Sequence, residues 1–295
     1  MAVTSFMSRL LFALVLLIIW LISGCSAKLS EQSFIAQSET VAPLTQARLN
    51  QWQLEFAQHT LSKVSLSRAD SAQTTHESAV LNGIYFDHAD SNDVIFFIQG
   101  NGMKLAQGGI NVAKTLAALN KDIIIFDHRG VGFSSGNASI KSLAEDAQAQ
   151  LAYIQQHYQP NKLIVHGFSL GSFIAARISN KADISALILQ GSATNVDDWI
   201  DARTPWYSKP FITIEVDEAF RQVDNLTVVE QQYTGPLLVI AGEQDNMAPA
   251  QLSTKLFNHS QSKHKELLMV EGASHSNMLL KANSMTVLSN FLSSL

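Results

Sequence analysis

The chain has a single cysteine, Cys25, among its 295 residues, which rules out an intramolecular disulfide. It has no excess of basic residues either: 20 lysines and arginines stand against 25 aspartates and glutamates, for a formal net charge of −5. Without a basic surface we expect no nucleic-acid partner. The nine histidines are scattered, with no His-x-x-x-His pair and no cysteine cluster, so the sequence predicts neither a metal site nor a cofactor.

An apolar run of about 13 residues, LLFALVLLIIWLI at 10–22, lies near the amino end and follows one positive charge, Arg9. It is short for a bilayer span but typical of a signal-peptide core. The run ends in ISGC, Ile22 to Cys25, which resembles the lipobox of bacterial lipoproteins. That resemblance implies a signal peptide at 1–24 and acylation of Cys25. An uncleaved anchor, with Cys25 an ordinary small residue, is the alternative.

The lipoprotein resemblance also implies a location and a domain layout. We expect a protein of the bacterial cell envelope, attached to a membrane by its lipid. The serine after the cysteine, Ser26, implies the outer membrane on its periplasmic side. Residues 25–45, polar and rich in serine and glutamine, are interpreted as a tether, followed by one folded domain at 46–295.

Short apolar runs alternate with helical patterns over most of that domain. A helical pattern at 47–61 and two β-rich segments, 63–69 and 80–88, come first, and the two segments suit antiparallel edge strands. Continuous apolar runs then predict strands buried on both faces at 93–99, 122–127, 162–167, 184–190, 236–242 and 266–272. Helical patterns separate them. The order predicts an α/β fold with a mostly parallel, doubly wound sheet.

A stretch of about 45 residues, 191–235, interrupts this alternation and contains Trp199, Trp206, Tyr207 and Phe211. It is too long for a plain connection between a strand and a helix. We interpret it as a small lid over the active site. The alternative is an extra helix packed at the edge of the sheet.

The sequence HGFSLGSF, 166–173, places Ser169 between Gly167 and Gly171 where a strand passes into a helix. The G-x-S-x-G pattern is typical of a nucleophile elbow, in which a sharp turn exposes the serine and the glycines relieve crowding. A serine needs a base oriented by a third group. Asp245 and His275 follow the next strands in the order acid, then histidine, so we expect all three at the carboxyl edge of the sheet.

Five segments together resemble the α/β-hydrolase superfamily of serine hydrolases, in the branch with an HGN-type oxyanion loop. They are QGNGMK, FDHRGVGFSSG, GFSLGS, AGEQDNMAP and GASHSN. The resemblance implies Ser169 as nucleophile, His275 as general base and acid, and Asp245 as the group that orients the imidazole. It implies an oxyanion hole from the backbone N–H groups of Leu170 and Asn101, with Gly102 as the alternative donor. The chain departs from the family by having Gln99 where His is usual.

The expected activity is cleavage of carboxylic esters, including lipid or acyl esters, through an acyl-serine intermediate. A peptidase or thioesterase of the same fold and an inactive binding lipoprotein remain alternatives. The glycines at 130, 132 and 136 also resemble a dinucleotide loop, but they come late in the sheet and far from a helix start. Asp127, Arg129, His128 and His166 are interpreted as structural.

Overall fold

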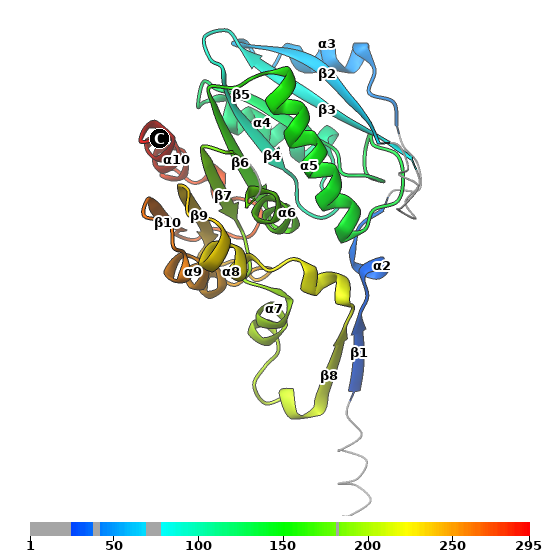
Figure 1. The fold of residues 1–295 in the computed structure, drawn as a ribbon, viewed down its shortest axis with the longest axis vertical. Coiled ribbons are helices and arrows are strands. Elements are labelled where there is room, and N and C mark those ends of the chain that lie inside the picture. The colour runs from blue at the N-terminus through cyan, green and yellow to red at the C-terminus, as the bar shows by residue number, and fades with distance from the viewer. Residues whose placement is uncertain (1–24, 38–41, 69–77, 181–182) are drawn as a thin grey trace, which may run out of the picture.

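The computed structural model describes residues 25–37, 42–68, 78–180 and 183–295. Within them the chain forms an eight-stranded sheet in the order β10-β9-β7-β6-β4-β5-β3-β2 (Figure 1). Its strands are β2 His59–Arg68, β3 Ala79–His88, β4 Asp93–Ile98, β5 Asp122–Phe126, β6 Lys162–Phe168, β7 Ala186–Gln190, β9 Leu237–Gly242 and β10 Lys265–Val270. The strands from β5 to β10 in this order are parallel, and β2 and β3 run antiparallel at one edge.

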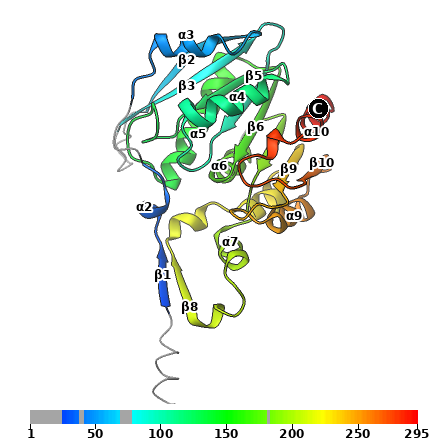
Figure 2. The same ribbon diagram turned by 180° about the vertical axis from the view of Figure 1, so that it is seen from behind.

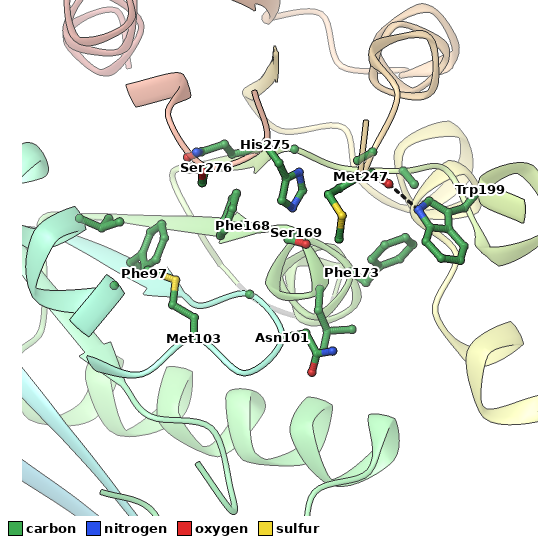
Figure 3. A pocket seen from close by; sticks show the side chains of 18 of the residues that line it. Phe97, Asn101, Met103, Phe168, Ser169, Phe173, Trp199, Met247, His275 and Ser276 are labelled. Carbon is green, nitrogen blue, oxygen red and sulfur yellow. Dashed lines mark hydrogen bonds between the residues drawn. The ribbon is translucent and has the colours of Figure 1, made fainter. Parts of the chain in front are cut away.

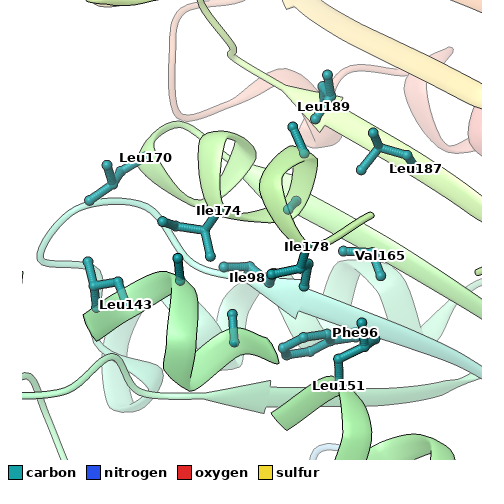
Figure 4. Packing of buried hydrophobic residues seen from close by; sticks show 14 of the residues in the cluster. Phe96, Ile98, Leu143, Leu151, Val165, Leu170, Ile174, Ile178, Leu187 and Leu189 are labelled. Atoms are coloured by element: carbon teal, nitrogen blue, oxygen red, sulfur yellow. The ribbon is translucent and has the colours of Figure 1, made fainter. Parts of the chain in front are cut away.

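Helices cover both faces of the sheet. One face carries α5 Ile140–His157, α6 Leu170–Ser179 and α9 Ala250–His259; the other carries α3 Gln46–Gln53, α4 Ile110–Ala117 and α10 Ser284–Ser293. Successive residues of a strand point to opposite faces, so Phe96 packs on the first face and Phe97 on the second. Because helices cover both faces, the side chains on both sides of such a strand are buried, which explains the continuous apolar runs. Figure 4 shows the first face, where Ile174 and Ile178 of α6 lie over the strands.

The helix expected at 47–61 is shorter than its pattern. α3 ends at Gln53, and the chain enters β2 at His59. Leu61 therefore pairs with Phe86 of β3 and is buried from β2 instead of from a helix. Pairing with a neighbouring strand overrides the local helical spacing, because it satisfies the backbone and buries the same side chain.

The segment expected to be a tether has regular structure where the model describes it. β1 Cys25–Leu29 pairs in parallel with β8 Ile212–Val216, and α2 Glu31–Phe34 follows. Ile35 and Leu44 are buried in the two cores. The structure thus differs from the expected tether, because β8 offers an open edge and the apolar residues of this segment have a core to enter.

The stretch 191–235 contains α7 Val196–Arg203, β8, α8 Asn225–Thr227 and several single helical turns. With β1 it forms a small layer that projects away from the eight-stranded sheet, beyond the carboxyl ends of its strands (Figures 1 and 2). We call residues 191–235 the lid. The signal peptide predicted at 1–24 lies outside the described residues, and none of the helices inside them is long and apolar enough to cross a membrane.

Candidate active site

Ser169 lies at the turn from β6 into α6, with backbone angles φ 52° and ψ −120°. Such a positive φ is rare for a residue with a side chain. The turn is possible because the neighbours are small: a Cβ on Gly167 would lie 2.6 Å from the Cβ of Ala175, and one on Gly171 would overlap the carbonyl oxygen of Ile98. The elbow predicted from G-x-S-x-G has this geometry.

His275 and Asp245 come together from the loops after β10 and β9. The Nδ1 of His275 donates to Oδ2 of Asp245 at 2.7 Å. The Asp245 side chain is fully buried, and its Oδ1 accepts the backbone N–H groups of Met247 and Ala248, each at 2.8 Å. A carboxylate held by three donors fixes the imidazole with Nδ1 protonated, so Nε2 keeps its lone pair.

The Ser169 hydroxyl and the His275 imidazole face the same cavity (Figure 3). Within the described part of the chain the Ser169 hydroxyl has no hydrogen bond to a protein group. Phe168 packs against the imidazole, with ring centroids 5.0 Å apart, and restricts its position. The residues predicted to form the triad therefore lie at one edge of the sheet, at the carboxyl ends of β6, β9 and β10.

The loop after β4 passes directly against the elbow. A Cβ on Gly100 would lie 3.2 Å from the Cβ of Ser169. Next to it, Asn101 lines the cavity, as does Leu170. Leu170 is the first residue of α6, so its N–H has no partner inside the helix. The two residues predicted to supply the oxyanion hole thus flank Ser169.

The amino-terminal segment holds this loop through the side chain of Asn101. Its Nδ2 donates to the carbonyl oxygen of Phe34 at 2.7 Å, and its Oδ1 accepts the backbone N–H of Ala36 at 2.9 Å. Leu29 and Phe34 also line the cavity. Sequence reasoning missed this contribution, because it placed residues 25–45 outside the folded domain and nothing local joins Phe34 to Asn101.

Gln99, at the position where the family has His, supports the same loop from below. It is buried, and its Nε2 donates to the carbonyl oxygen of Phe126 at 2.9 Å and to Oδ1 of Asp127 at 3.1 Å. Asp127 also accepts the backbone N–H groups of Leu105 and Phe133. Burial raises the pKa of Asp127 to about 6, although these donors act in the opposite direction. Both side chains brace loops and do not reach the cavity.

The other residues interpreted as structural also lie away from the cavity, with Arg129 and His166 buried and His128 partly buried. Arg129 binds Asp146 through two nitrogens, at 2.7 and 2.8 Å. His128 donates from Nε2 to the carbonyl oxygen of Gln99 at 2.7 Å, and burial lowers its pKa. Burial also lowers the pKa of His166, to about 4. These histidines support the loops and strands beneath Ser169.

The cavity has a volume of about 600 Å³ and extends to both sides of Ser169. Figure 3 shows Phe97 and Met103 on one side and Phe173, Met247 and Trp199 on the other. We call the first side, which reaches Val112 and Thr115, the α4 arm, and the second, which reaches Val223 and Phe220, the lid arm. Apart from His275, no lining residue in the described part of the chain is titratable or charged.

The lid covers the cavity with only some of its aromatic residues. Trp199 lines the cavity, and its Nε1 donates to the carbonyl oxygen of Met247 at 2.7 Å, which ties α7 to the loop that carries Asp245. Trp206, Tyr207 and Phe211 do not line it and are exposed. Of the four aromatic residues noted in this stretch, Trp199 therefore covers the cavity, and the other three lie in the connection between α7 and β8.

Two further predictions from the sequence concern the glycines of the 130–136 loop and the residues that could bind a metal. Gly130, Gly132 and Gly136 all have positive φ, and a Cβ on Gly132 would overlap the Asp127 carboxylate. They shape a loop beneath the site. Across residues 25–37, 42–68, 78–180 and 183–295, no group of three or more His, Cys, Asp or Glu residues could hold a metal ion.

Comparison with known proteins agrees with this architecture. A family model described as alpha/beta hydrolase fold matches residues 93–211. Protein bem46 of Schizosaccharomyces pombe is 29% identical over 60% of this chain and 59% of its own, and lysophosphatidylserine lipase ABHD12 of Danio rerio is 27% identical over 57% and 47%. The chain thus spans about half of these relatives' length. The structure of the Pyrococcus furiosus esterase Pf2001 superposes with a TM-score of 0.66 at 18% identity, over 88% of this chain and 97% of that one.

Proposed function

Because the chain has the α/β-hydrolase fold, as its sequence predicted, and its relatives support hydrolase activity, we propose that it is a serine hydrolase that cleaves carboxylic esters. The observation that carries the proposal is the hydrogen bond from His275 to the buried Asp245, with the imidazole and Ser169 facing one cavity that has no charged lining. A hydroxyl on a sharp turn and an imidazole with a free Nε2 are the groups that acyl transfer requires.

In the proposed reaction, Nε2 of His275 takes the proton of Ser169 as Oγ attacks the ester carbonyl. Asp245 stabilises the imidazolium that forms. The backbone N–H groups of Leu170 and Asn101 donate to the oxyanion, and such donors each contribute about 100- to 1,000-fold in rate. His275 then protonates the leaving alcohol. Water, activated by the same nitrogen, hydrolyses the acyl-serine.

The lining of the cavity favours an ester with apolar groups on both sides. Both arms are lined mainly by aliphatic and aromatic side chains, and each buried methylene contributes ~0.8 kcal/mol. A peptide would bring many backbone donors and acceptors into a lining that offers few partners. We therefore place lipid or acyl esters first. The name of the zebrafish relative, a lysophosphatidylserine lipase, is consistent with this class.

We propose further that the protein is exported and held at the cell envelope by a lipid on Cys25, with the outer membrane as the membrane involved. The support is the apolar run at 10–22 followed by ISGC. Cys25→Ala should abolish acylation and leave unprocessed precursor. Processing that is unchanged in the variant would instead favour an ordinary signal peptide or an uncleaved anchor.

Labelling with a fluorophosphonate probe tests the activity. The wild type should label and Ser169→Ala should not, whereas Ser289→Ala, which alters an exposed serine on α10, should label normally. Parallel panels of esters, thioesters and peptides then separate the chemistry: hydrolysis of esters first supports the proposal. Preference for thioesters or peptides, or a wild type that does not label, would contradict it.

A further inference from the structure

The loop between α7 and β8 exposes large apolar side chains that the proposed reaction does not use. Trp206 is 81% exposed, Tyr207 64% and Phe211 51%. They belong to residues 204–212, which we call the lid tip. The rings of Trp206 and Tyr207 contact each other edge to face, with centroids 6.0 Å apart. Clustered exposed aromatic residues on a folded domain indicate a surface that another phase or partner covers.

The lid tip lies where the amino-terminal segment enters the fold. β8 begins at Ile212, which is paired with Cys25, the first residue of β1. Because the two strands are parallel, the lid tip lies at the same end of this small sheet as Cys25. Figures 1 and 2 show this end as the part of the described chain farthest from the eight-stranded sheet. The sequence that leads to Cys25 is the apolar run at 10–22.

We propose that the lid tip docks on a lipid bilayer, with Trp206, Tyr207 and Phe211 in the interfacial region. Because the apolar run at 10–22 leads directly to Cys25, a lipid bilayer is favoured over a second protein as the partner of the lid tip. Tryptophan and tyrosine are the residues that prefer the headgroup level of a membrane. This inference does not depend on the proposed hydrolase activity.

The charges at the lid tip indicate which bilayer it would accept. Lys209 is the tip's only charged residue, and it forms an ion pair with Asp201. The tip is thus balanced in charge, so docking should rely on apolar burial and should not require anionic lipid.

Docking at this end leaves the cavity open to substrate. Leu29, at the far end of β1 from Cys25, lines the lid arm. Four residue-to-residue steps of extended strand join Cys25 to Leu29, a distance of about 13 Å. The lid tip can therefore touch the interface while the cavity stays just above it. A lipid ester would have a short path from the bilayer to Ser169.

Tryptophan fluorescence of the full chain in phosphatidylcholine vesicles tests the proposal. Trp20→Phe serves as the background, because Trp20 lies in the apolar run. The contribution of Trp206 is the difference between this protein and the same protein with Trp206→Phe. In vesicles with brominated acyl chains that contribution should fall at least about twofold, and it should be protected from aqueous iodide. Trp52→Phe is the matched control, since Trp52 is a buried residue of α3 and should contribute nothing to lipid quenching.

Two results would overturn the proposal. One is a Trp206 contribution that iodide quenches and brominated lipid does not. The other is protection from iodide without lipid quenching, which would assign the tip to a protein contact. If the chain hydrolyses esters, Trp206→Ser with Phe211→Ser should lower turnover of vesicle-borne ester about tenfold and leave turnover of a soluble short ester unchanged. If it hydrolyses none, the fluorescence result still decides docking.

Discussion

Ser169 holds a backbone conformation that its side chain disfavours, at a cost of about 1–3 kcal/mol. The surroundings maintain it. The Ser169 N–H donates to the carbonyl oxygen of Gln190 at 2.9 Å, and the Ser172 N–H donates back to the Ser169 carbonyl oxygen at 2.9 Å. These two bonds hold the backbone that presents the hydroxyl to the cavity.

Asp245→Asn tests the orientation of the imidazole. The amide would offer an N–H to His275 and favour the wrong tautomer, while the packing stays the same. We expect turnover to fall by up to about 10,000-fold, with the free energy of unfolding changed by no more than about 2 kcal/mol. Steady-state kinetics and urea unfolding measure the two quantities.

Asp217→Asn is the matched control for that variant. Asp217 accepts the backbone N–H of Glu31 and pairs with Lys28, and Asp224, another aspartate of the lid, caps α8. Neither bonds to His275, so turnover should stay within about twofold of the wild type. Near-normal turnover in Asp245→Asn would show that another acid orients the histidine.

Because of His166, we expect the free energy of unfolding to fall as the pH is lowered. It is fully buried, donates from Nε2 to Gln190 at 2.9 Å, and has a pKa lowered from 6.5 to about 4. Between these values the unfolded chain binds a proton that the folded chain excludes. Its contribution to stability is therefore complete above pH 6.5 and is lost as the pH falls towards 4, by up to about 1.4 kcal/mol per pH unit.

His166→Gln should reduce that slope, because glutamine can still donate to Gln190 and does not titrate. Urea unfolding across the window from pH 6.5 to about 4 measures it. His128, whose pKa burial also lowers, contributes a slope of the same sign, whereas Asp127, whose pKa burial raises to about 6, contributes one of the opposite sign. An unchanged slope in the variant would show that His166 does not resist protonation.

Among the elements, β1 and α2 act as a part of the active site. They supply Leu29 and Phe34 to the cavity and hold Asn101 through two hydrogen bonds. The loop after β4 is therefore supported from two sides, by this segment above and by Gln99 and Asp127 below. A backbone donor must keep its place to within a fraction of an ångström to stabilise an oxyanion.

Asn101→Ala removes the upper support and leaves the backbone N–H in the loop. We expect kcat to fall about tenfold with KM changed less than about threefold, because positioning acts on the transition state more than on substrate binding. Gln37→Ala is the control: it deletes two hydrogen bonds between the same segment and Ala138, at 2.9 and 3.3 Å, but none to the loop. Equal losses of kcat in both variants would mean that the segment acts only through general stability.

At the scale of the whole molecule, the cavity lies where the sheet and the lid meet. One arm is lined from the main domain, at α4, and the other from the lid. Val112 of α4 lines one arm and Val223 of the lid lines the other. This division predicts that the two sides of an ester are selected separately. The acyl group would extend along one arm and the alcohol along the other.

Val112→Trp and Val223→Trp test the division with two series of esters, one that lengthens the acyl chain and one that lengthens the alcohol. Each variant should lower kcat/KM for the long members of one series only. Excluding three methylenes costs roughly 2 kcal/mol, which is about 30-fold. If both variants affect the same series, the cavity binds substrate along a single path.

Much of the fold could be predicted from local patterns. The strands β4 to β7, β9 and β10 were read from continuous apolar runs, and the order of Ser169, Asp245 and His275 followed from the ends of those strands. Burial on both faces was wrong for β10, which is a partly exposed edge strand because it has a neighbour on one side only. The residue at which α3 ends could not be predicted in this way, because the pairing of Leu61 with Phe86 in the sheet ends the helical pattern early. The residues that line both arms were not predicted either, since they come from segments far apart in the chain.

Apolar periodicity and glycine spacing act between near neighbours, so the amino-acid order was sufficient for the sheet, the elbow at Ser169 and the sequence of loops that reach it. The contact of Phe34 with Asn101 and the pairing of Cys25 with Ile212 join residues that no local pattern connects. Only the folded chain decided that the amino-terminal segment completes the site and that the lid tip lies beside Cys25, because burial and backbone pairing are settled by whichever surfaces meet in three dimensions.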